Sequence, residues 1–153
     1  MTGEHFVQED FRVLTPEAFD FVLSNELKRA VRSQNFLTLV VFEPRADAPG
    51  REALREVARI VSREVRETDL LAASPEGRLS LVLLDADLQS SRRVIERVMS
   101  RLEHYQFTTP IDVEVGAACC PTQGSDPGTL RRAAEADAAA SRGPERGTAS
   151  NAQ

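Results

Sequence analysis

Arginine is the residue type whose spacing in this sequence most clearly suggests chemistry. One predicted helix carries three arginines at i, i+4 and i+7, and another carries three at i, i+4 and i+8, so each set follows one helix face. A guanidinium presents a planar fork of donors that fits a phosphate or a guanine edge. The two rows therefore predict an anion-binding surface. The rows are Arg59, Arg63 and Arg66, and Arg93, Arg97 and Arg101.

Rows of this kind also occur on solvated helix faces, where arginines pair with glutamates one turn away on the same helix. Acidic residues are interspersed with both rows, so this alternative stays open. The glutamates concerned are Glu52, Glu56, Glu64 and Glu96.

Carboxylates that could hold a metal ion are scattered along the sequence. Glu43 ends an apolar segment, which suits a surface acid at the end of a strand. Asp85 and Asp87 lie between a predicted strand and a predicted helix, where loop and N-cap roles account for them. Only His5 and His104 could add imidazole, so no set of zinc ligands is complete. No Ser-His-Asp or Cys-His signature occurs. The sequence predicts no metal and no cofactor.

Composition sets limits on the class of protein. The 153 residues are 41% hydrophobic and 28% charged, which suits one globular domain with a hydrophobic core. A formal net charge of −5 argues against nucleic-acid binding, and no apolar run is long enough to cross a membrane. The adjacent Cys119 and Cys120 would point to opposite faces of a strand, so we expect reduced thiols and a cytoplasmic location.

The periodicity of apolar residues predicts four helices and four strands. Thr15 and Pro16 mark a helix start, as N-cap and first helical residue. Residues 36–42 form a nearly continuous apolar run, which favours a buried central strand. Apolar residues alternate with Asp112 and Glu114, which predicts a half-buried strand with both acids on the exposed face. The predicted helices are 16–32, 51–67, 88–105 and 129–141, and the predicted strands are 36–42, 69–73, 79–84 and 111–117.

The order of these elements predicts the fold class. From the first strand onward the chain reads β-α-β-β-α-β and then a helix, the split βαβ pattern of ferredoxin-like folds. We therefore expect an α/β protein of the α+β type, with an antiparallel sheet flanked by helices and with added N- and C-terminal helices. The domain is expected over 13–143, after a polar lead-in (1–12) and before a disordered tail (144–153). The alanine-rich segment 133–140 fits either the core or a partner-binding face.

Several segments, in this order and spacing, resemble the GGDEF domains of bacterial diguanylate cyclases. The resemblance covers roughly residues 13–143 and implies a nucleotide-cyclase-like fold in cyclic di-GMP signalling. The segments are Val13-Leu14-Thr15, Leu39-Val40-Val41-Phe42, Arg55-Glu56-Val57-Ala58-Arg59, Arg66-Glu67-Thr68-Asp69-Leu70-Leu71-Ala72, Leu81-Val82-Leu83-Leu84, Val113-Glu114-Val115-Gly116-Ala117 and Leu130-Arg131-Arg132-Ala133.

The resemblance also implies that the catalytic residues are lost. Cyclisation of GTP needs divalent metals held by carboxylates, but the metal-binding acid of the signature turn falls on Arg78. Glu43 is the only carboxylate near the position of the second metal ligand, residues 45–50 are too short to hold the guanine-reading segment, and the phosphate-binding lysine falls on Ser141. We therefore expect no cyclase activity. The degenerate turn is Pro75, Glu76, Gly77, Arg78 and Leu79.

One family feature survives, the inhibitory product site written RxxD. Arg66-Glu67-Thr68-Asp69 fits it, five residues before Pro75, and a second arginine of that site falls on Arg97. The resemblance implies that Arg66, Asp69 and Arg97 bind cyclic di-GMP. Alternatively, Asp69 caps backbone amides at the turn from helix to strand, and Arg66 pairs with it or favours the helix C-terminus.

Two functions remain open on the sequence alone. The first is a catalytically inactive GGDEF-like signalling domain that binds cyclic di-GMP and acts through a protein partner or through self-association. The second is a nucleotide-blind docking or dimerisation module. Residual cyclase activity is a third, weaker hypothesis. The sequence does not name the partner.

Overall fold

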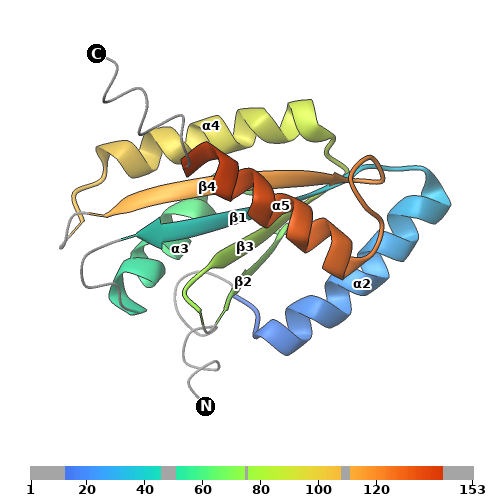
Figure 1. Ribbon diagram of the computed structural model, residues 1–153. Helices are drawn as coiled ribbons and strands as arrows, with labels where there is room; N and C mark the ends of the chain where they lie inside the picture. The colour runs from blue at the N-terminus through green and yellow to red at the C-terminus, as the bar shows by residue number, and fades with distance from the viewer. Residues whose placement is uncertain (1–12, 46–50, 75, 108–110, 143–153) are drawn as a thin grey trace.

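A computed structural model describes residues 13–45, 51–74, 76–107 and 111–142 (Figure 1). Within these ranges the eight predicted elements are all present. They are α2 (Pro16–Ser33), β1 (Leu37–Arg45), α3 (Arg51–Glu64), β2 (Leu70–Ala73), β3 (Leu79–Leu84), α4 (Leu88–His104), β4 (Asp112–Cys120) and α5 (Pro127–Arg142).

Side-chain caps fix the starts of two helices. The Thr15 hydroxyl accepts a hydrogen bond from the backbone N–H of Ala18 at 3.2 Å, and Pro16 occupies the first turn of α2. The Asp87 carboxylate accepts from the backbone N–H of Ser90 at 2.8 Å and begins α4. Both caps satisfy amides that have no partner inside the helix. The N-cap roles predicted from the sequence are confirmed.

The four strands form one antiparallel sheet in the order β2-β3-β1-β4. This order is the one that a split βαβ connection produces, so the predicted fold class is confirmed. Helices α3 and α4 cover one face of the sheet, and α2 and α5 cover the other (Figure 1). The central strand β1 is buried on both faces over residues 37–42, as its continuous apolar run predicts.

Strand β4 differs from its prediction. It extends to Cys120, three residues beyond the predicted end, and it carries both buried free thiols. Asp112 is exposed as predicted, but Glu114 is buried, so the expectation that both acids face solvent is wrong. The reason is that α5 covers the face of β4 that carries Glu114, and the carboxylate lies 3.7 Å from the Arg45 guanidinium.

Helix α5 approaches β4 at Gly116. A Cβ atom at Gly116 would lie 2.8 Å from the Cα of Ala138 and would also overlap the Ala134 carbonyl oxygen. Ala134 and Ala138 belong to α5, and both are buried in the core between this helix and the sheet. Of the two roles that the sequence left open for the alanine-rich segment, the buried alanines of this helix therefore have the first: they belong to the core and not to a partner-binding face.

Among the described residues, no helix combines the length and the apolar character that a membrane span requires.

This close approach predicts a large effect of one methyl group. Gly116→Ala should lower the free energy of unfolding by about 3 kcal/mol, because α5 must move away from the sheet. Urea denaturation measures this change in the free energy of unfolding. Gly128→Ala is the matched control: Gly128 lies in the first turn of α5, and the nearest atoms to an added Cβ are side-chain atoms at 3.5 Å. The control should be neutral or stabilising by up to about 1 kcal/mol. Equal effects of the two changes would contradict the packing described.

Candidate functional site

The carboxylate of Asp69 holds the turn between α3 and β2. Its Oδ2 accepts from the backbone N–H of Arg66 at 3.0 Å, and its Oδ1 accepts from the backbone N–H of Leu84 at 3.2 Å. The backbone N–H of Asp69 in turn donates to the Arg66 carbonyl at 3.0 Å. The Asp69 side chain is only 2% exposed. These contacts are those of the structural alternative, in which Asp69 caps backbone amides.

Arg66 lies across the same turn but remains open to solvent. Its Nη2 donates to the Leu84 carbonyl at 2.8 Å, and its Nε lies 3.8 Å from Asp69 Oδ2. The side chain is 65% exposed, so most of its donors face water. Asp69 and Leu84 therefore orient this guanidinium without covering it.

Arg97 lies beside the end of α3. Its Nε donates to Glu64 Oε1 at 2.9 Å, and its Nη2 donates to the Glu64 backbone carbonyl, also at 2.9 Å. Glu64 is the last residue of α3, two positions before Arg66, so the structure brings the three predicted residues to one end of this helix. The second contact also provides a donor for a helix C-terminus, where carbonyl groups have no intrahelical partner.

Glu64 is the residue of this region whose role sequence reasoning missed. Its Oε2 also lies 3.1 Å from Arg101 Nε, so one carboxylate joins two arginines of α4. The sequence suggested pairs one turn apart on the same helix, whereas these pairs join two helices. Helical spacing cannot reveal a contact whose partners are 33 positions apart.

The segment that the resemblance aligns with the family's signature turn connects β2 to β3. The Ser74 N–H donates to the Arg78 carbonyl at 2.8 Å, and the Gly77 N–H donates to the Ser74 carbonyl at 3.0 Å. Gly77 has a φ of 94°, which favours glycine. The pKa of Glu76 is lowered, first by the Ser74 hydroxyl that hydrogen-bonds its carboxylate. Leu79 is buried, and Pro75 lies outside the described residues.

Arg78 forms ion pairs at the position where the resemblance places a metal-binding acid. Its Nε lies 3.3 Å from Glu43 Oε2, and its Nη1 lies 3.4 Å from Glu135 Oε2. The guanidinium thus forms an ion pair with Glu43, the only carboxylate that the sequence offered as a remaining ligand. Over the described part of the chain, no cluster of acids, histidines and cysteines could hold a metal ion. These residues do not fit the divalent metal that GTP cyclisation requires.

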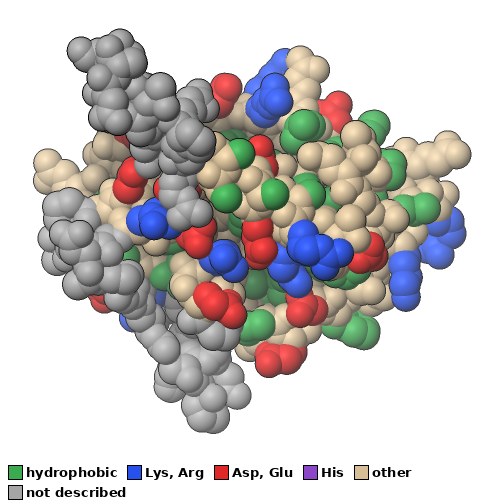
Figure 2. Space-filling view, viewed as in Figure 1, with side chains coloured by type: hydrophobic (Ala, Val, Ile, Leu, Met, Phe, Trp, Pro, Cys, Tyr) green, Lys and Arg blue, Asp and Glu red, His purple; other side chains and the backbone are tan. Residues whose placement is uncertain are grey.

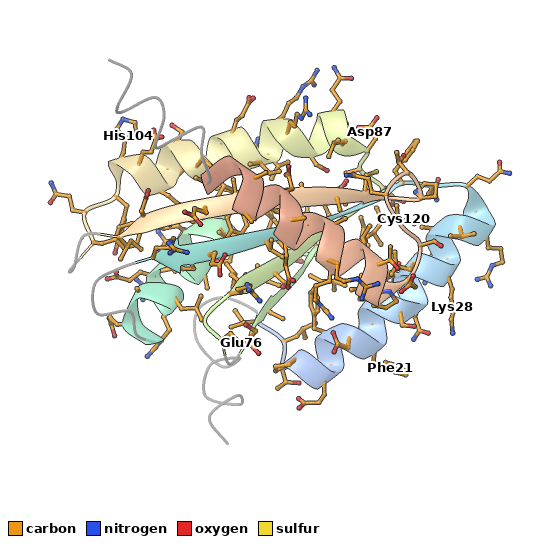
Figure 3. All side chains as sticks on the ribbon, in the orientation of Figure 1. Phe21, Lys28, Glu76, Asp87, His104 and Cys120 are labelled. Carbon is orange, nitrogen blue, oxygen red and sulfur yellow. The ribbon has the colours of Figure 1, made fainter. Side chains whose placement is uncertain are left out.

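The remaining candidates lie elsewhere. Figure 3 shows Glu76 at the β2–β3 turn and Asp87 at the start of α4, in separate parts of the molecule. His104, in the last turn of α4, has its Nδ1 2.8 Å from the Ser100 carbonyl, a contact within its own helix. Figure 2 shows acidic and basic side chains interspersed on the face that carries α5. His5 and residues 46–50 lie outside the described residues, and nothing is described of the side chain of Ser141.

Comparison with solved structures identifies the fold. The GGDEF domain of TpbB (YfiN) from Pseudomonas aeruginosa aligns with a TM-score of 0.75 at 16% identity, covering 86% of each chain. A diguanylate cyclase protein from Thermotoga maritima aligns with a TM-score of 0.74 at 19% identity, covering 84% of this chain and 98% of the other. The GGDEF domain of DgcB from Caulobacter crescentus, in complex with cyclic di-GMP, aligns with a TM-score of 0.71 at 17% identity, covering 88% of each chain.

By sequence, neither a protein-family model nor a curated protein matches the chain. The structural matches show that the chain has the fold of GGDEF domains, and they confirm at the level of fold the resemblance that the sequence segments carry.

The contacts of Asp69 predict a structural role that unfolding experiments can measure. Asp69→Ala leaves the amides of Arg66 and Leu84 without their acceptor, so it should lower the free energy of unfolding by about 2 to 4 kcal/mol. Asp69→Asn keeps one acceptor oxygen and should lie between that variant and the wild type. Thr68→Ala, an exposed position in the same turn, should change stability by less than about 0.5 kcal/mol. If Asp69→Ala were as stable as Thr68→Ala, the carboxylate would not hold the turn.

Proposed function

We propose that this domain is a catalytically inactive GGDEF-like signalling module that binds cyclic di-GMP through Arg66 and Arg97. The observation that carries the proposal is the pair of exposed guanidiniums held at the end of α3. Each is oriented by hydrogen bonds to the backbone of this chain, and each keeps donors directed to water. A cyclic dinucleotide carries two phosphates and two guanine edges, which are the groups that such forks recognise.

Loss of catalysis is supported by Arg78. A guanidinium cannot ligate a divalent metal, and this one is paired with two carboxylates, Glu43 and Glu135. Placing a metal ion there would require breaking both ion pairs and would leave Arg78 close to another cation. In this proposal the turn not only lacks one metal-binding acid, but its ion pairs also disfavour the metal binding that GTP cyclisation requires.

In this proposal Asp69 acts on the ligand indirectly. Its carboxylate is buried and accepts from two backbone amides, so it holds Arg66 in place and does not itself contact a guanine. Binding of the dinucleotide would add negative charge beside α3 and α4 and so alter the surface offered to a protein partner or to another copy of the domain.

A nucleotide-blind docking or dimerisation module is the second candidate. The observation in its favour is that Arg66, Asp69 and Arg97 are each hydrogen-bonded within the chain. Contacts of this kind would maintain the fold even where no ligand binds. The two candidates therefore differ in one measurable property, the affinity for the dinucleotide.

Isothermal titration with cyclic di-GMP separates these candidates. The wild type should bind with micromolar or tighter affinity, and Arg66→Ala should weaken binding by about tenfold or more, because charge-assisted hydrogen bonds to a phosphate are lost. Arg92→Ala removes the same charge from an exposed position of α4 outside the arginine row, and it should bind like the wild type. GTP with Mg²⁺ should give no cyclic product. Wild type that releases no heat would favour the docking module, and equal binding by Arg66→Ala would refute the assigned site.

A further inference from the structure

We propose that Glu64 is an internal counter-anion that sets the affinity for phosphate of the surface formed by Arg66, Arg97 and Arg101. The inference rests on the proposed function, because it concerns the same surface, but it assigns a role to a residue outside the predicted set. In this view the domain contains its own competitor for the ligand. Removing the charge of Glu64 should therefore strengthen anion binding.

The geometry shows one carboxylate shared between two guanidiniums. Glu64 Oε1 accepts from Arg97 Nε at 2.9 Å, while Oε2 lies 3.1 Å from Arg101 Nε. Arg97 and Arg101 are one turn apart on α4, so their side chains lie on one face of the helix. A phosphate also offers charged oxygens to two neighbouring guanidiniums. Glu64 thus makes the same kind of contact as the proposed ligand.

Burial strengthens the effect of this contact. The Glu64 side chain is 12% exposed, whereas those of Arg97 and Arg101 are 51% and 67% exposed. The negative charge is therefore less screened by water than charges on the open surface. It offsets one of the two positive charges and uses the Nε donor of Arg97. An anion that arrives from solvent meets a surface with a smaller field and fewer available donors.

A purely structural role for Glu64 makes the opposite prediction. If the carboxylate served mainly to orient Arg97 and Arg101, removing it would scatter their side chains and weaken anion binding. If it competes with the anion, removing it strengthens binding. The sign of the change in affinity therefore decides between the two roles.

The experiment titrates inorganic pyrophosphate and cyclic di-GMP separately into the wild type, Glu64→Gln and Glu64→Ala. The NMR signals of the arginine Nε–H groups report binding at Arg97 and Arg101. Both substitutions should raise the affinity for pyrophosphate by about tenfold, the effect of removing one partly shielded charge. Glu96→Gln is the matched control, because it removes the same charge from an exposed position next to Arg97. It should change the affinity less than about twofold.

The two probes separate this inference from the proposed function. Tighter pyrophosphate binding by both Glu64 variants, with no cyclic di-GMP binding by any protein, would support the role of Glu64 and refute the receptor function. Pyrophosphate affinity that is unchanged, weaker or undetectable in both variants would overturn the role of Glu64, whatever the dinucleotide does. An equal gain in Glu96→Gln would also overturn it, because net charge alone would then explain the effect. Thermal unfolding checks that each variant is folded, and Glu64→Ala provides a second test if Glu64→Gln is unstable.

Discussion

The buried carboxylate of Asp69 is the interaction on which the proposed site depends. It joins the end of α3 to the end of β3, because it accepts from the amides of Arg66 and Leu84 at once. Without it, the amide of Arg66, just after α3, and the amide of Leu84, at the end of β3, would lose their acceptor. The hydrogen bond from the Arg66 amide to Asp69 also fixes the backbone of Arg66, and the Arg66 guanidinium donates to the Leu84 carbonyl. A structural contact and an arginine of the proposed site therefore belong to one short motif, and the structural contact accounts for the motif even without a ligand.

The arrangement of charges differs between two regions, the turn around Arg78 and the end of α3. At the turn between β2 and β3, Arg78 is only partly exposed and is paired with Glu43 and Glu135, so both carboxylates already have a cationic partner. At the end of α3, Glu64 balances part of the charge of two arginines whose side chains remain largely in solvent. The carboxylates of the first region are engaged by a guanidinium, whereas the second region keeps an excess of positive charge that favours anions.

The fold followed from the sequence because its signals are local. Cap residues such as Thr15 and Asp87 and the apolar run of β1 each act within a few positions, and they gave the elements in the right order. The contacts that define the site join distant positions. The apolar-polar alternation placed Glu114 in solvent because helix α5, which covers it, comes later in the chain. The ion pair between Glu135 and Arg78 could not be predicted either, because Glu135 lies on α5 and no sequence pattern near residue 78 indicates that this helix packs there.

Mapping of backbone amide NMR shifts on addition of cyclic di-GMP would test the central claim most directly. The account predicts shifts confined to the end of α3, to the turn through Asp69, to Leu84 and to the face of α4 around Arg97. Signals from the turn around Arg78 should stay in place. Shifts centred on that turn, or no shifts with a saturating amount of the dinucleotide, would contradict the account.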